Sequence, residues 1–228
     1  MGNERPPTWG FLTNHALVLI FLIRHRGSTV REIAEGVRIT ERATLAILRQ
    51  LSDDGIIERR RDGRRNTYAV NFEQLASRRR AGTVALTPRS FVDGLIHVLL
   101  VISDYHASDR GPQRPTATVD SGAMEPRIGT WGFLTNHALL LLAIALDRHS
   151  TVREMAASVG VTERAVVALL NQLEDEGIIV RIRQGRRNSY EIDLEALRRF
   201  PRWSPGEWQF PPQLIDVAVA GLRSLMRA

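Results

Sequence analysis

The chain has 228 residues, of which 43% are hydrophobic, and a formal net charge of +6. The length fits one or two domains, and the hydrophobic fraction is sufficient for packed cores and too high for a disordered chain. There is no cysteine, which excludes disulfides, thiolate metal sites and cysteine nucleophiles, and all 31 basic residues are arginine, whose guanidinium group grips phosphate at two points.

The first predicted element is a helix that is capped by Thr13 and runs to about His25. It is apolar nearly all round, which indicates a helix buried at the centre of the fold. Its apolar run over residues 16–23, and a second run over residues 138–146, are both shorter than the ~20 residues that a membrane span requires. The N-terminal sequence MGNERPPTWG does not resemble a secretory signal peptide. We therefore expect a soluble, cytoplasmic protein with no membrane partner.

A capped helix, a short turn and another capped helix are predicted next. Thr29 and Glu32 have the T-x-x-E spacing of a capping box, in which each side chain satisfies an orphan amide of the other residue. Residues 36–39 (Gly-Val-Arg-Ile) are predicted to form the turn. Thr40 then caps a third helix, which is expected to end at Asp54-Gly55 because glycine commonly follows a helix in the left-handed conformation.

The third helix has an apolar face and a polar face. Its apolar residues follow an i, i+4, i+5, i+8 spacing, which predicts that the buried positions are Ala43, Ile47, Leu48 and Leu51. The opposite face carries Glu41, Arg42, Leu45, Ala46 and Arg49. Thr44 is expected to turn inward.

Two β-prone runs, IIERRR and RNTYAV, flank Asp62-Gly63 and predict a hairpin. Arginines crowd its tip: Arg59, Arg60, Arg61, Arg64 and Arg65. A solvated charged hairpin is one interpretation. So many like charges at one turn cost folding energy, however, which favours an anionic partner. A helix near residues 72–80 and an apolar trailing helix at 91–104 are expected to follow.

The second half of the chain repeats the first. Residues 8–75 align with residues 130–197 without a gap, at a constant offset of 122, and about 40 of the 68 aligned positions are identical. TWGFLTNHAL, TVRE, TER and GRRN all recur in register, which chance does not explain, and we infer an internal gene duplication. A weaker match between residues 91–104 and 214–227 extends the repeat to the trailing helix.

The repeat divides the chain into two predicted domains. The first spans residues 1–104 and the second residues 129–228, and each comprises a repeated unit with its trailing helix. Residues 105–128 between them are rich in Pro, Gly, Ser and Thr and lack hydrophobic periodicity, which predicts a linker.

The alignment also predicts the elements of the second copy. Thr151 and Glu154 repeat the capping box, and Glu176-Gly177 ends the third helix. The hairpin turns at Gln184-Gly185, and the first strand alternates, with Ile178, Val180 and Ile182 on one face and Arg181 and Arg183 on the other. Val166 replaces Thr44 and is likewise expected to turn inward.

The order of helix, capped helix, turn, capped helix and two-stranded wing resembles the MarR-type winged helix-turn-helix regulators and, more loosely, the ArsR-type regulators. The resemblance covers about 68 residues of each copy. It rests on TVREIAEGVRITERATLAILRQLSDDGII, on its counterpart TVREMAASVGVTERAVVALLNQLEDEGII, and on the wing RRRDGRRNTY. It implies a mainly α fold with small β-wings and double-stranded DNA as the partner. MarR-type proteins act as homodimers joined by terminal helices, and their wing-tip arginines lie along the minor groove.

The third helix is the candidate recognition helix, because its N-terminal residues reach base edges in the major groove of helix-turn-helix complexes. Arg42 suits guanine, and Glu41 suits the N4 group of cytosine. The alternative for Thr40 and Glu41 is a local role in capping the helix and matching its dipole. Residues at the start of the second helix are expected to reach phosphate through amides and side chains.

The candidate DNA contacts occupy equivalent positions in the two copies. In the first copy they are Thr29, Arg31, Thr40, Glu41, Arg42, Arg49, Arg59, Arg61, Arg64 and Arg65. In the second copy they are Thr151, Arg153, Thr162, Glu163, Arg164, Asn171, Arg181, Arg183, Arg186 and Arg187. The main difference is Arg49 against Asn171, since arginine prefers guanine or phosphate and asparagine pairs best with adenine.

No residue pattern indicates an enzyme, a metal site or a cofactor. His15 and His137 have no second histidine at helical spacing, so a structural role beside the Thr13 cap is favoured over metal binding. Residues 104–106 (Asp-Tyr-His) resemble the Asp-x-His of some ArsR-type zinc sites, but they lack downstream ligands and are absent from the second copy. Three aromatic residues peculiar to the second copy are expected to pack on a core or to line a ligand pocket: Trp203, Trp208 and Phe210.

We expect a sequence-specific transcription regulator that acts as a monomeric pseudo-dimer or as a homodimer, with helices 91–104 and 214–227 in its dimerisation layer. Two alternatives stay open. One is a tandem winged-helix scaffold for protein interactions, against which the arginine tips argue. The other is a nucleoid or RNA-binding protein of low sequence specificity. The sequence identifies neither the operator nor a small-molecule effector.

Overall fold

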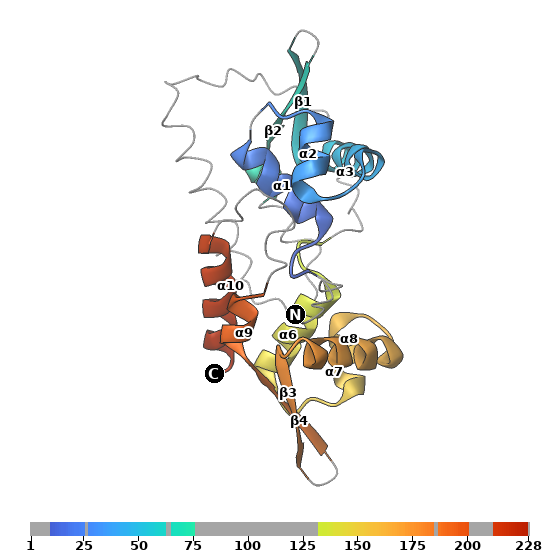
Figure 1. Cartoon of the computed structure of the whole chain (residues 1–228). Helices are drawn as coiled ribbons and strands as arrows, with labels where there is room; N and C mark the ends of the chain where they lie inside the picture. Colours follow the sequence, from blue (N-terminus) through green and yellow to red (C-terminus); the bar gives the residue numbers. More distant parts are fainter. Residues whose placement is uncertain are drawn as a thin grey trace, which may run out of the picture.

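The computed structural model describes residues 10–25, 27–62, 65–75, 132–184, 187–200 and 212–227. In these residues the fold is mainly helical, with two small antiparallel sheets of two strands each (Figure 1). None of the helices in this part of the chain is long and apolar enough to cross a membrane. The helix predicted at 91–104, the linker and the aromatic residues at 203–210 lie outside the described residues. So do Arg64 and Arg186, and the side chains of Arg65 and Arg187 are not described.

The N-terminal unit, residues 10–75, has the predicted order of elements. These are α1 (Asn14–Arg24), α2 (Val30–Val37), α3 (Glu41–Asp53), β1 (Ile57–Asp62) and β2 (Arg65–Val70). Each helix begins after a threonine whose hydroxyl accepts a hydrogen bond from an amide of the first turn, namely Thr13, Thr29 and Thr40. The capping box of Thr29 and Glu32 is complete, as predicted. Gly55 follows α3 at a φ of 69°, in the left-handed conformation expected there.

The C-terminal unit, residues 132–227, begins with the same succession of elements. These are α6 (Asn136–Leu146), α7 (Val152–Val159), α8 (Glu163–Asp175), β3 (Ile179–Gln184) and β4 (Arg187–Ile192). Every bound lies 122 residues after its equivalent in the N-terminal unit. The helix caps are Thr135, Thr151 and Thr162. Two further helices, α9 (Leu194–Arg198) and α10 (Pro212–Leu225), follow.

The turn between α2 and α3 begins later than predicted. Gly36 and Val37 belong to α2, and the turn starts at Arg38, which adopts a left-handed φ of 57°. Gly36 is required for packing, because a Cβ atom at this position would lie 2.1 Å from Cε2 of Phe21 in α1. The left-handed position in the C-terminal unit is Gly160, at a φ of 77°. The prediction of a turn at Gly36 was wrong because this glycine serves a contact between helices.

The inward face of α3 differs from the prediction at one position. Its buried residues are Thr44, Ile47, Leu48 and Leu51. Ala43 is only half-buried, so its place in the buried stripe was wrong. Thr44 is fully buried instead, and its hydroxyl donates to the carbonyl of Thr40 at 3.1 Å, which satisfies the polar group inside the core. Val166 is fully buried at the equivalent position of α8, as expected.

The helices α1 and α6 form the centres of the two cores. All side chains from Ala16 to Ile23 are buried, which confirms the prediction of a central apolar helix. The helices α2 and α3 pack on α1, and α7 and α8 pack on α6. A histidine ties each central helix to the third helix of its unit: His15 Nε2 lies 2.9 Å from Gln50 Oε1, and His137 Nε2 lies 2.6 Å from Gln172 Oε1. These contacts support the structural role that the sequence favours for both histidines.

The two units are joined by the extended segments that precede α1 and α6, at residues 10–13 and 132–135. Leu12 and Leu134 form an antiparallel β-bridge. The flanking backbone bonds run from the Thr13 amide to the Phe133 carbonyl (2.9 Å) and from the Thr135 amide to the Phe11 carbonyl (3.1 Å). The hydroxyls of Thr13 and Thr135 donate to the carbonyls of Gly132 and Gly10, each at 2.6 Å. Each contact recurs with the two units exchanged, so this junction has local two-fold symmetry.

The helix α10 packs within its own unit, on α6 and α9. Arg198 of α9 forms an ion pair with Asp216 of α10 at 2.6 Å. Residues 214–227 were predicted to lie in a dimerisation layer with the helix at 91–104, which lies outside the described residues. Within the described residues, the hydrogen bonds between the units come from the paired segments. This junction was not predicted, although its residues belong to the repeated TWGFLT.

We predict that acid weakens the fold through His137. Burial lowers the pKa of His137 below its ordinary value of 6.5, and the hydrogen bond to Gln172 offsets this only in part. As the pH falls, the unfolded chain, in which His137 has its ordinary pKa, therefore binds a proton before the folded chain does. The free energy of unfolding decreases as a result. The Tm should fall between about pH 7.5 and about pH 5.5. His137→Gln should remove part of that decrease, as measured by thermal unfolding at a series of pH values. His149→Gln, which removes an exposed histidine, is the control, and an equal effect of both substitutions would contradict the prediction.

Candidate nucleic-acid interface

The helices α3 and α8 expose the residues that the sequence analysis assigned to base contact. They are Glu41, Arg42 and Arg49 in α3, and Glu163, Arg164 and Asn171 in α8. Arg42 and Arg164 lie in the first turn of each helix, where the positive end of the helix dipole disfavours a cation. Within the described residues, neither arginine forms an ion pair inside the protein. Both guanidinium groups are therefore available to an external acceptor.

The threonines that precede these helices act as caps. Thr40 Oγ1 accepts a hydrogen bond from the Ala43 amide at 3.1 Å, and Thr162 Oγ1 accepts one from the Ala165 amide at 3.2 Å. The capping role that the sequence analysis offered as the alternative is therefore present for both threonines. Each hydroxyl can still donate its proton to an outside acceptor.

The starts of α2 and α7 are largely occupied by their own acidic residues. The Glu32 carboxylate accepts from the amide and the hydroxyl of Thr29 at 2.6 and 2.9 Å. Thr151 and Glu154 repeat the arrangement at 2.7 and 2.8 Å. A carboxylate over the helix N-terminus repels a second anion, so side chains rather than amides are left to meet phosphate at these positions.

Arg31 and Arg153, the cations beside these caps, differ in their partners. Arg31 Nε donates to Glu35 Oε1 at 2.9 Å, and this hydrogen bond raises the pKa of Arg31. In the C-terminal unit Ala157 stands in place of Glu35, so the partner of Arg31 has no counterpart beside Arg153. Because the pair of Arg31 is exposed and weak, a phosphate can replace the carboxylate.

The first hairpin presents two of its arginines on one face. Strands β1 and β2 pair from Ile57 opposite Val70 to Asp62 opposite Arg65. Arg59 and Arg61 are two residues apart and therefore share a face, while Arg60 lies on the other face and pairs with Glu58 at 2.8 Å. Arg59 and Arg61 are exposed and form no ion pair in the described part of the chain.

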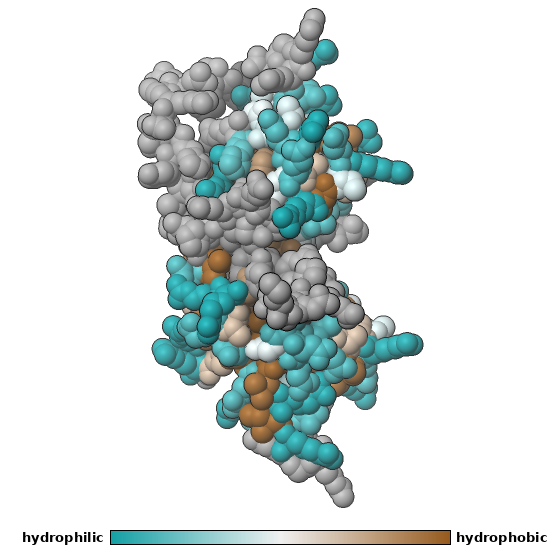
Figure 2. Space-filling model, in the orientation of Figure 1, coloured by the Kyte–Doolittle hydropathy of each residue, from teal (hydrophilic) through white to brown (hydrophobic). Residues whose placement is uncertain are grey.

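The second hairpin divides its faces as predicted, but the face that packs on the unit is not the apolar one. Val180 is 54% exposed, although the sequence predicts an apolar face that contains it. Arg181 is half-buried and lies over the ring of Tyr190, whereas Arg183 is exposed. The residues alternate as predicted, but the face with Arg181 is the one that packs on the unit. Figure 2 accordingly shows apolar surface over the base of this hairpin.

The two candidate recognition helices, α3 and α8, are accessible from one side of the molecule. In Figure 1, α3 and α8 lie on the same side, and the two hairpins point to opposite ends. This arrangement follows from the two-fold symmetry of the junction, which relates one unit to the other. One extended partner can therefore meet both helices.

An exposed apolar residue that was not predicted as part of a site lies on each of α3 and α8. Leu45 and Val167 occupy equivalent positions and are 39% and 44% exposed. An exposed apolar side chain among polar ones can contact the methyl group of thymine. The sequence feature that could have revealed these two positions is a large apolar residue on the otherwise polar face of each predicted helix.

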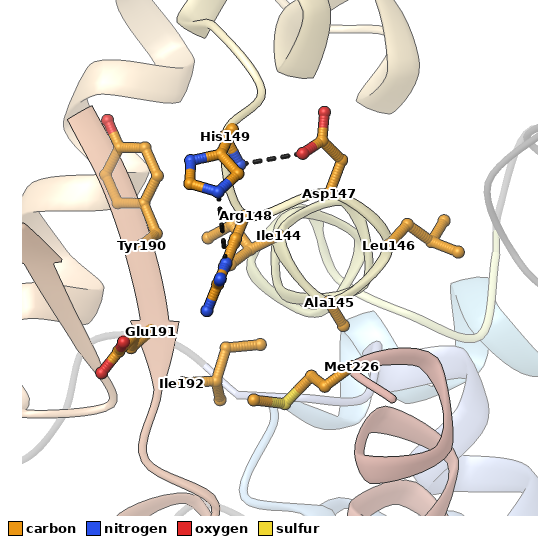
Figure 3. Close-up of a pocket in the computed structure, with 10 residues that line it drawn as sticks. All are labelled: Ile144, Ala145, Leu146, Asp147, Arg148, His149, Tyr190, Glu191, Ile192 and Met226. Atoms are coloured by element: carbon orange, nitrogen blue, oxygen red, sulfur yellow. Dashed lines mark hydrogen bonds between the residues drawn. The ribbon is translucent and has the colours of Figure 1, made fainter. Parts of the chain in front are cut away.

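A pocket of about 530 Å³ opens in the C-terminal unit between the ends of α6 and α10 and strand β4 (Figure 3). Its lining combines apolar side chains, among them Ile144 and Met226, with the polar Arg148 and His149. The His149 amide donates to the Asp147 carboxylate at 2.9 Å and holds the pKa of that carboxyl below its ordinary value. The size lies within the range of ~300–1,000 Å³ typical of small-molecule sites. Among the described residues, no three His, Asp or Glu side chains are grouped so as to hold a metal ion.

Comparison with protein-family models identifies the class of the N-terminal unit. Residues 14–58, which span α1, α2, α3 and the start of β1, match the family described as winged helix-turn-helix DNA-binding. This confirms the predicted winged helix-turn-helix for that part of the chain. The match does not distinguish the MarR type from other members of the class. No curated protein and no solved structure matches the chain.

Substitutions should separate contacts to bases from contacts to the backbone of DNA. Arg42→Ala and Arg164→Ala are expected to relax the preference for particular bases, at roughly 1–3 kcal/mol each where the arginine is bidentate. Arg61→Ala and Arg183→Ala should weaken binding to all sequences alike, because a wing arginine that meets phosphate carries no sequence information. Competition between specific and random duplexes at fixed salt measures both effects. Equal losses on the two duplexes for all four variants would show that α3 and α8 do not read bases.

Proposed function

We propose that this chain is a sequence-specific, double-stranded DNA-binding transcription regulator without enzymatic activity. Two winged helix-turn-helix units that arose by gene duplication act in it as an intramolecular pseudo-dimer. The observation that carries the proposal is the two-fold junction of residues 10–13 and 132–135, next to a unit that matches a DNA-binding family. Such a junction relates α3 to α8 in the way that a dimer interface relates the recognition helices of two subunits.

On DNA, one chain would bind both half-sites, which a homodimer binds with two subunits. The helices α3 and α8 enter successive major grooves on one face of the duplex, where half-sites lie ~34 Å apart. The arginine-rich hairpins, at opposite ends of the molecule in Figure 1, reach the flanking minor grooves.

The two half-sites are related but not identical. The sequence Thr-Glu-Arg recurs at residues 40–42 and 162–164, so the same core bases are read twice. The difference comes mainly from Arg49 against Asn171, with the exposed Leu45 against Val167 as a smaller term, because the substitution of Thr44 by Val166 lies in the core. An asymmetric operator would fix the direction in which the protein binds. Neutral drift at exposed positions is the alternative, and it predicts a symmetric site.

Two other functions differ from this one in measurable ways. A protein-interaction scaffold predicts no binding to duplex DNA, and a nucleoid or RNA-binding protein predicts affinity that hardly depends on sequence. The family match favours DNA over a scaffold. The pocket beside β4 has a suitable size for a small-molecule effector.

We predict that duplex binding depends strongly on salt. If the wings neutralise ~6 phosphates, log K should fall with log salt at a slope of about −5, since each neutralised phosphate contributes about −0.9. Titration of a labelled duplex at a series of salt concentrations measures the slope. A slope near zero, or no binding to any duplex at low salt, would refute the DNA-binding function.

A further inference from the structure

We propose that Glu174 and Asn171 hold the wing arginine Arg181 against the C-terminal recognition helix, so that the N-terminal unit supplies most of the grip on the DNA backbone. This inference rests on the DNA-binding function proposed above and assigns unequal roles to the two units. Glu174 is a positioning residue, because it acts on DNA through Arg181. Asn171 combines two roles, because its Oδ1 accepts from Arg181 while its amide N–H groups can still donate to a base.

Arg181 is held by contacts from two elements. Its Nη2 donates a hydrogen bond to Oδ1 of Asn171 and forms an ion pair with Oε2 of Glu174, each at 3.0 Å. Its guanidinium carbon lies 5.9 Å from the centroid of the Tyr190 ring. The side chain is only 30% exposed, and its Nε is buried without a hydrogen-bond partner. Since Glu174 and Asn171 belong to the C-terminal half of α8, these bonds tie the wing strand β3 to the recognition helix.

The N-terminal unit keeps the arginine and the aromatic ring but lacks both acceptors. The four equivalent positions are Arg59, Tyr68, Arg49 and Ser52, in place of Arg181, Tyr190, Asn171 and Glu174. Arg59 and Arg49 are both exposed, and neither forms an ion pair in the described part of the chain. Where the C-terminal unit neutralises its wing arginine internally, the N-terminal unit therefore presents two cations to an outside anion.

The charge of the two repeats differs in the same direction. Residues 8–75 contain eleven arginines and eight acidic residues, a formal charge of +3, whereas residues 130–197 contain seven arginines and nine acidic residues, a formal charge of −2. A positive unit attracts the DNA backbone at long range, and a negative unit does not. The contacts of Arg181 are thus the local form of a difference that extends over the whole repeat.

Binding to the DNA backbone requires cations that are free to replace counterions. A guanidinium group already paired with a carboxylate releases fewer counterions, and Glu174 itself repels phosphate. Salt screens a partly buried pair less than an exposed one, so the pair of Arg181 persists under conditions in which surface pairs weaken. Phosphate therefore competes poorly with Glu174 and Asn171 for Arg181, whereas it can bind Arg59 without displacing a carboxylate.

A purely structural brace is the other interpretation of the same contacts. In that case the network serves only to hold β3 on α8, and breaking it would loosen the hairpin and weaken any contact with DNA. A network that withholds Arg181 from DNA predicts the opposite result, because Glu174→Ser would release a cation and remove a repulsive charge. The sign of the change in affinity separates the two interpretations.

The chain supplies matched variants, because each unit carries an alternative set of residues at equivalent positions. Asn171→Arg with Glu174→Ser gives the C-terminal unit the residues of the N-terminal unit, and Arg49→Asn with Ser52→Glu makes the reverse exchange. Glu174→Ser alone tests the carboxylate. Each full-length variant is titrated onto a random duplex, which reports backbone contacts, at several salt concentrations. Thermal unfolding shows whether each variant is folded.

Glu174→Ser should bind the random duplex about eightfold more tightly at 0.1 M salt, and the slope of log K against log salt should steepen by about 1, as expected for one additional neutralised phosphate. The double exchange in the C-terminal unit should enlarge both changes. The reverse exchange in the N-terminal unit should weaken binding and flatten the slope. The inference is overturned if Glu174→Ser binds no more tightly than the wild type, or if the reverse exchange leaves binding unchanged. If the wild type binds DNA and all variants bind it with the same affinity, only the unequal roles of the two units are rejected. If the wild type binds no duplex, the DNA-binding function is rejected as well.

Discussion

The paired segments at residues 10–13 and 132–135 are the constraint on which the rest of the structure depends. The Thr13 hydroxyl accepts from the Ala16 amide inside its own unit and donates to a carbonyl of the other unit. Thr135 does the same in the opposite direction. One hydroxyl therefore both starts a central helix and joins the units. Because α3 packs on α1 and α8 packs on α6, the junction also sets how the two recognition helices are related.

Fusion of two units in one chain allows their surfaces to diverge separately. In a homodimer, a substitution on the recognition helix alters both half-sites at once, whereas here Arg49 and Asn171 differ within one molecule. Inward positions have changed only among residues that still pack, as with Thr44 and Val166, both fully buried. Outward positions have changed in charge, as with Ser52 and Glu174. Packing has thus conserved the fold of each unit, while the surfaces that face a partner have become different.

Local signals predicted much of this structure, and contacts between distant residues account for what they missed. The three helix caps and the terminating Gly55 depend on neighbouring residues, so the sequence indicates them directly. Gly36 led to the wrong prediction of a turn, because a glycine is needed there to make room for the Phe21 ring of another helix. The half-buried position of the Arg181 side chain depends on Asn171 and Glu174 in α8, and the alternation of residues in β3 does not reveal these partners. Among the candidate contacts, exposure on α3 and α8 was predictable, whereas the unequal pairing of the arginines was not.

The central claim is that one chain reads both half-sites. Native mass spectrometry of the full chain with a duplex chosen by selection from a random library gives the stoichiometry, and hydroxyl-radical footprinting of the same complex gives the contacts. The account predicts one chain per duplex and two protected segments about one helical turn, ~34 Å, apart. Two chains on each duplex, or one protected segment under a single chain, would contradict it.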